Sequence, residues 1–268
     1  MKLNIVPPRT GFLWVRLGVR VFLRQPLALS VLFFLCMACM TLATLIPLAG
    51  TVLALAMLPT VTLVMMAGAA EAHLGKRPLP TLLLVAFRTG RERARAMAVL
   101  GLLYAAGFLL VIALSALIDG GEFATVYLGA KAPTQEMVES ASFQGAMWLA
   151  MLLYIPLSLL FWHAPGLVHW HAVPPVKALF FSIVACWRNL GAFMLYELGW
   201  LGVFMALGVV VSLIVAMLSM AGLGLGAATS LMLVTAIALA AMFFSSVVFT
   251  FRDCFEAPAA EPAHEPAA

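Results

Sequence analysis

The sequence predicts an all-α integral membrane protein with about six transmembrane helices, and two observations carry this prediction. Of the 268 residues, 65% are hydrophobic and 10% are charged, whereas a soluble domain is nearer half apolar and a quarter charged. Apolar stretches long enough to cross a bilayer also recur from Leu27 to Phe251, with no segment between them that resembles a soluble domain. We therefore expect one six-span membrane domain, residues 27–256.

The spans are predicted from runs of about 20 apolar residues, the length that crosses the hydrocarbon core. They cover residues 27–48, 50–70, 97–118 and 145–164, and the run 191–251 is long enough for two more. The cluster Gly222, Gly224 and Gly226 indicates a turn that divides this last run. Only residues 47–50 separate the first two spans, so these must form an antiparallel hairpin.

Two flanking segments differ from the spans. Residues 1–26 are predicted to form a cytoplasmic amphipathic segment that lies at the membrane interface, because its arginines fall on one helical face and its large apolar residues on another. Residues 257–268 contain almost only Ala, Pro and Glu, and this tail is predicted to be disordered.

The distribution of basic residues predicts the orientation in the membrane. Fourteen of the fifteen lysines and arginines lie before the first span, between the second and third, between the fourth and fifth, or after the sixth. The opposite side has only Lys131, in a loop that also carries four acidic residues. The positive-inside rule therefore predicts that both termini are cytoplasmic.

A threefold internal pattern is also predicted. Each of the three segments on the cytoplasmic side opens with two prolines, continues through roughly 15 residues of helical pattern ending in a basic residue, and enters a pair of spans. In the second segment, Arg88, Arg91 and Arg95 are expected on one helix. Three repeats of interfacial helix plus transmembrane hairpin would explain this pattern, although any six-span protein with short loops can look like three hairpins.

A candidate polar or ion site is suggested by Glu197, which lies within the fifth span, where a carboxyl group is costly unless it is paired, hydrated or protonated. The nearest candidate partners are Arg188 and His163, His169 and His171 near the end of the fourth span. We expect a buried Glu197 carboxyl turned toward the fourth span. The alternative is a carboxylate close enough to the cytoplasmic surface to reach water or to pair with Arg188 or a histidine.

The arginines suggest contacts with anionic lipid headgroups. The candidate contacts are Arg9, Arg16, Arg20, Arg24, Arg88, Arg91 and Arg95. Topology determination by positive charge is a sufficient alternative explanation for them. Binding to nucleic acid is not expected, because no soluble domain is predicted that could present the charge.

Sequence motifs of enzymes and pumps are missing. The chain has no nucleotide-binding loop, no G-x-S-x-G and no H-E-x-x-H. The histidines match no recognised ligand spacing, and Cys36 and Cys39 lie among apolar residues, where packing is the more frequent role. No catalytic residue, metal or cofactor is therefore predicted.

Several segments resemble an uncharacterised family of proteobacterial multispan inner-membrane proteins. They are N-I-V-P-P-R-T-G (4–11), R-Q-P-L-A-L (24–29), F-W-H-A-P-G-L-V (161–168), P-P-V-K-A-L-F-F-S (174–182) and C-W-R-N (186–189). The resemblance implies a bacterial inner-membrane location and six spans, but no activity. More distantly, the arrangement is similar to membrane domains fused to glycerophosphodiester phosphodiesterases, whose catalytic domain is absent here.

Two classes of function are therefore predicted. The first is a non-catalytic inner-membrane protein that organises anionic lipid or partner membrane proteins, or that forms a homo-oligomer. The second is a transporter of a small solute or ion through a pathway that includes Glu197 and the histidines of the fourth span. The first is favoured because intramembrane polar groups are few, and a transport pathway usually needs more of them.

Overall fold

The computed structural model describes residues 2–220 and 225–255, which form helices and one isolated bridge between Leu3 and Phe255. Six helices in this part of the chain are long and apolar enough to cross a membrane, which confirms the predicted class. They are α2 (Pro26–Thr44), α3 (Gly50–His73), α5 (Arg91–Asp119), α8 (Ala141–Phe161), α11 (Leu190–Met220) and α12 (Leu225–Cys254). The predicted turn residues Gly222 and Gly224, and the tail 257–268, lie outside the described residues.

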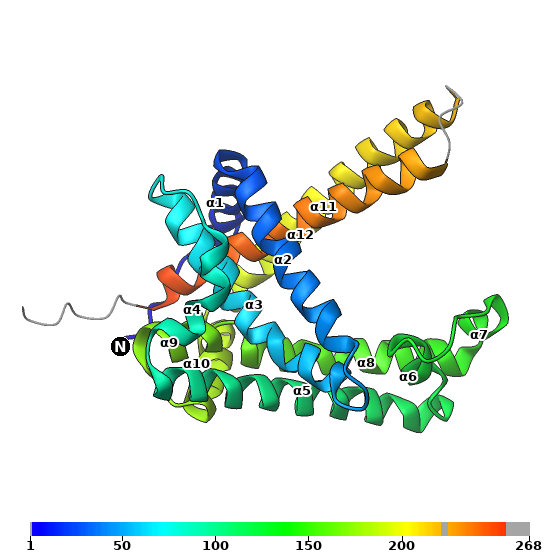
Figure 1. The fold of residues 1–268 in the computed structure, drawn as a ribbon, viewed down its shortest axis with the longest axis horizontal. Coiled ribbons are helices and arrows are strands. Elements are labelled where there is room, and N and C mark those ends of the chain that lie inside the picture. Colours follow the sequence, from blue (N-terminus) through cyan, green and yellow to red (C-terminus); the bar gives the residue numbers. More distant parts are fainter. Residues whose placement is uncertain (1, 221–224, 256–268) are drawn as a thin grey trace, which may run out of the picture.

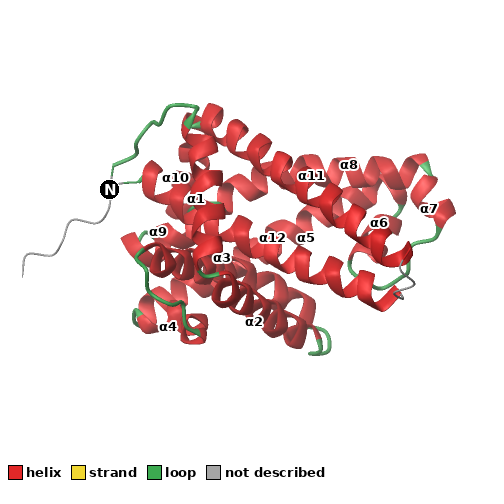
Figure 2. Cartoon of the chain, turned by 90° about the horizontal axis from the view of Figure 1, so that it is seen from above, coloured by secondary structure: helices red, strands yellow, loops and turns green. Residues whose placement is uncertain are grey.

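The spans form three hairpins, α2 with α3, α5 with α8 and α11 with α12 (Figure 1). The shorter elements gather at two ends (Figure 2). The basal end carries α1 (Thr10–Arg24), η1 (Pro80–Leu84), α4 (Val85–Arg88), α9 (Ala164–His171) and α10 (Pro175–Arg188), and the distal end carries α6 (Glu122–Tyr127) and α7 (Gln135–Glu139). The two short distal helices belong to a loop for which no structure was predicted.

Local sequence explains where several helices begin and end. Pro26 occupies the first turn of α2, where its missing N–H costs no hydrogen bond. Gly90 and Gly120, which flank α5, have φ values of 101° and 68°, and glycine adopts this region without strain. The hydroxyl of Ser140 accepts a hydrogen bond from Phe143 N at 3.3 Å and thereby caps α8.

Each basal segment packs mainly against a hairpin that is not the one it leads into. Helix α1 leads into α2 but packs on α11 and α12, the η1–α4 segment packs on α2 and α3, and α10 packs on α8 and α5. The three basal segments and three hairpins therefore alternate around the basal end. This order agrees with three repeats, although the repeat itself stays a prediction.

The second basal segment departs from the single helix that the sequence suggested. A 3₁₀ turn, η1, precedes the four-residue α4, and the chain then breaks at Gly90. Arg88 consequently lies on α4, whereas Arg91 and Arg95 lie on the first turns of the span α5. The predicted alignment of these arginines on one helix is wrong, because the positive φ of Gly90 turns the chain between them.

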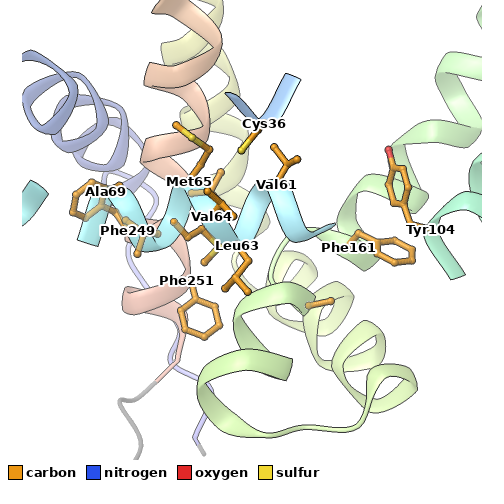
Figure 3. Packing of buried hydrophobic residues seen from close by; sticks show 14 of the residues in the cluster. Cys36, Val61, Leu63, Val64, Met65, Ala69, Tyr104, Phe161, Phe249 and Phe251 are labelled. Carbon is orange, nitrogen blue, oxygen red and sulfur yellow. The ribbon is translucent and has the colours of Figure 1, made fainter. Parts of the chain in front are cut away.

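Helix α3 runs through the middle of the core (Figure 3). Its residues Leu63, Met65 and Met66 are fully buried, between the end of α12 and the α5–α8 hairpin. On the latter side the rings of Tyr104 and Phe161 meet edge to face with centroids 5.0 Å apart. The basal half of the bundle is therefore close-packed around a central helix.

Candidate functional site

The first helix is held in one orientation by close packing. Gly18 of α1 faces α12 so closely that an added Cβ would lie 2.3 Å from the Cβ of Ser246. Trp14 is fully buried, and its indole N–H donates to a carboxylate oxygen of Asp253 at 2.8 Å. The face of α1 that the sequence marks as apolar therefore packs on protein. The opposite face is left open.

The open face of α1 carries the predicted arginines. Arg16, Arg20 and Arg24 are exposed and, with Val19 and Leu23, line a shallow hollow of about 460 Å³, the arginine hollow. Leu23 is 65% exposed. Only Gln25 separates α1 from the first residue of the span α2. Three guanidinium groups and an exposed leucine thus lie together where a span begins.

The other predicted lipid contacts are more dispersed. Arg9, Arg88, Arg91 and Arg95 are exposed, but they line no hollow with the first group. Arg93, which was not singled out, is half-buried and donates to the backbone carbonyl of His169 at 2.8 Å, linking α5 to α9. Its neighbours Arg91 and Arg95 on α5 are exposed, whereas this hydrogen bond holds the guanidinium of Arg93 against α9.

The histidines of the fourth span do not converge on Glu197. His163 is fully buried, and its Nε2 lies 3.3 Å from the hydroxyl of Thr250. His169 is buried, and His171, which is half-buried, contacts the ring of Phe251. Among the residues that the structure describes, no group of three His, Cys, Asp or Glu side chains could hold a metal ion.

The pair His163 and Cys186 does not resemble a reactive dyad. The sulfur of Cys186 lies 3.7 Å from Nδ1 of His163, and the hydroxyl of Ser182 accepts a hydrogen bond from His163 N at 2.9 Å. Burial raises the pKa of the Cys186 thiol, so the thiolate required of a nucleophile is disfavoured. These contacts join α10 to the end of α8.

The position of Glu197 differs from the one expected from the sequence. It is exposed on the same face of α11 as Met194, Leu198 and Leu201, and it makes no hydrogen bond or ion pair within the described part of the chain. The expected carboxyl buried beside His163 or Arg188 is wrong, because the inward face of α11 is occupied by Tyr196 and its aromatic neighbours. Arg188 is itself exposed at the end of α10.

These features define an all-helical membrane protein with six candidate spans and an arginine-bearing basal end. The chain belongs to a family of probable inner membrane proteins. It is 40% identical over 259 residues to a Burkholderia thailandensis protein named as a probable inner membrane protein, and the match covers 95% of this chain and 94% of that relative. The resemblance to an uncharacterised proteobacterial membrane family is thereby confirmed.

Two further comparisons gave no match. No family model matches the chain, and no solved structure matches it. The relative's name specifies a membrane location and no activity.

Proposed function

We propose that this protein organises anionic phospholipid at the cytoplasmic face of the inner membrane without catalysing a reaction. The arginine hollow is the observation that carries the proposal, because Arg16, Arg20 and Arg24 are exposed together beside the start of α2. A headgroup phosphate accepts hydrogen bonds from guanidinium in a geometry that lysine does not match. Leu23, exposed in the same hollow, would contact the upper part of the acyl chains.

The orientation is part of this proposal. Helix α1 lies at the basal end, and fourteen of the fifteen basic residues flank the spans on that side by their places in the sequence. With the basal end in the cytoplasm, the arginine hollow faces the leaflet whose anionic lipids attract juxtamembrane basic residues. Both termini are then cytoplasmic.

The test replaces Arg16, Arg20 and Arg24 together by glutamine. Each arginine near an anionic surface contributes about 1 kcal/mol, so removing three should lower the local preference for anionic lipid by roughly a hundredfold. We expect the purified variant to retain several-fold less phosphatidylglycerol and cardiolipin per protein, measured by mass spectrometry of the extracted lipid.

The matched control changes the same three residues to lysine, which keeps the charge. This variant should retain intermediate amounts of anionic lipid, because point charge survives but bidentate geometry is lost. Equal anionic lipid in the parent and the glutamine variant, with both proteins correctly inserted, would contradict the proposal and leave topology determination as the role of these arginines.

A further inference from the structure

A second feature lies within the membrane-spanning part, away from the arginine hollow. Two adjoining cavities, of about 160 and 350 Å³, share the lining residues Leu58, Tyr104 and Tyr154. The first lies between α3, α5, α8 and α12 and reaches Trp162, and the second extends along α5 and α8 to Tyr127 of α6. Because they share these walls, we treat the two as one cleft, the inter-hairpin cleft.

With α5 and α8 spanning the bilayer, the cleft would lie at the depth of the hydrocarbon core. Tyr104 is near the middle of the 29-residue α5. The lining on α8 runs from Ala150 to Phe161, about 16 Å at the helical rise per residue. A bilayer core is about 30 Å thick, so this length corresponds to roughly half of its thickness. A lining of this length matches a hydrocarbon chain better than a compact solute.

Four hydroxyl groups that line the cleft are already paired within the protein. The hydroxyl of Thr62 donates to Leu58 O at 3.2 Å, and that of Ser158 donates to Ile155 O at 2.7 Å. The hydroxyls of Tyr104 and Tyr154 lie 3.3 Å apart and bond each other. A hydrophilic solute would lose its hydration here and find few free partners, whereas an alkyl chain loses nothing.

The cleft is continuous with the lipid-facing surface. Tyr154, which lines it, is 41% exposed, and its neighbour Ile155 on the outer face of α8 is 56% exposed. The α11–α12 hairpin diverges from the α5–α8 hairpin toward the distal end (Figure 1). A molecule dissolved in the bilayer can therefore enter without crossing a polar surface.

We infer that the inter-hairpin cleft binds one acyl chain of a membrane phospholipid, which enters from the bilayer between α8 and α12. This site is independent of the arginine hollow, because the cleft contacts the acyl chain of the lipid and not its charged headgroup. Unfilled space of this size at this depth would cost the packing contacts of its walls, and the surrounding bilayer supplies alkyl chains to fill it.

The test uses tryptophan fluorescence in vesicles of phosphatidylcholine whose chains carry bromine at their middle, compared with unbrominated vesicles. Trp162 lines the cleft, while Trp14 and Trp200 are buried elsewhere and should not contact lipid. Bromine quenches a tryptophan that it touches. We expect Trp162→Phe to lose the quenched emission that Trp162 contributes, and Ser158→Phe, which fills the cleft, to lose the same amount.

The matched control is Ser219→Phe, because Ser219 also donates to its own helix, at 2.9 Å to Val215 O, but is exposed on α11 outside the cleft. Its quenching should equal that of the parent. The glutamine variant of the arginine hollow should also match the parent, since phosphatidylcholine has no net charge. Failure of the arginine proposal would therefore leave this result unchanged.

Native mass spectrometry of the detergent-solubilised parent and Ser158→Phe proteins gives a readout that needs no tryptophan substitution. We expect a monomer carrying one phospholipid for the parent and its loss in Ser158→Phe. Equal quenching in the parent, Trp162→Phe and Ser158→Phe proteins would overturn the inference. So would a parent dimer without lipid, which would place a second copy of the chain in the cleft.

Discussion

At the scale of single residues, Asn189 links three distant segments. Its side-chain oxygen accepts a hydrogen bond from Val6 N at 2.8 Å, and its amide nitrogen donates to Asn4 O at 3.1 Å and to Ala185 O at 3.0 Å. The same nitrogen lies 3.6 Å from the sulfur of Cys254. This buried amide therefore holds the N-terminal strand-like segment against the α10–α11 junction and the end of α12.

Replacing Asn189 by leucine should destabilise the protein by about 2 kcal/mol, because it leaves the partly buried Val6 N–H and Asn4 carbonyl without partners. The measurement is thermal unfolding of the purified protein in detergent. Asn4→Leu is the control, since the Asn4 side chain has only a long 3.5 Å hydrogen bond to Asp253 O. An unchanged unfolding midpoint for Asn189→Leu would show that water replaces the lost bonds.

At the scale of elements, α1 shows how an amphipathic pattern can be satisfied by protein instead of lipid. Gly11 and Gly18 let this helix approach α11 and α12 until side chains would collide with the backbone of Ala192 and with Ser246. Val15 and Val21 are buried in the same interface. The apolar face of α1 is thus part of the core, and its arginine face is held outward.

The close packing of α1 predicts that one added methyl group changes stability differently at Gly18 and at Gly202. Gly18→Ala should lower stability by about 1–3 kcal/mol, because the new Cβ overlaps Ser246. Gly202→Ala on α11 meets no atom within 4 Å and should be neutral or stabilising, since alanine favours the helix. Thermal unfolding of both variants checks this. A Gly18→Ala protein as stable as Gly202→Ala would mean that α1 moves away without cost.

At the scale of the whole molecule, the basic residues gather at the basal end, where most of the short helices lie. The basal end carries α1, α4 and α10 with their arginines, whereas Lys131 lies between α6 and α7 at the distal end. The hairpins radiate from the basal end, where the basal segments alternate with them. One end of the protein is therefore both its most basic and its most closely packed part.

The expected orientation can be tested by labelling cysteines with a membrane-impermeant maleimide in intact spheroplasts. Ala132→Cys, in the loop near Gly129, should react, whereas Thr81→Cys on η1 should react only after permeabilisation. Both positions are exposed and avoid the positive φ angles of Gly129 and Gly90. The parent protein is the control for the four native cysteines. Reaction of Thr81→Cys in intact spheroplasts would reverse the orientation.

Residues of the candidate sites were only partly predictable. The polar stripe of α1 predicts that its arginines are exposed, and the structure places them on the outward face of the helix. Glu197 was expected to face inward because lipid offers it no partner, yet Tyr196 occupies the inward position of α11. The cleft residues Tyr104 and Tyr154 went unnoticed, because nothing local to either span shows that they meet across two helices.

The sequence by itself determined the membrane class, the six spans and the concentration of basic residues at one end. These are properties of composition and local hydropathy, and each segment satisfies its backbone hydrogen bonds as a helix whatever surrounds it. Only the tertiary structure decided that α1 packs on the third hairpin, that Glu197 faces outward and that a cleft separates the hairpins. In a membrane, lipid-facing and protein-facing residues are equally apolar, so the sequence of a span carries little information about its rotation and neighbours.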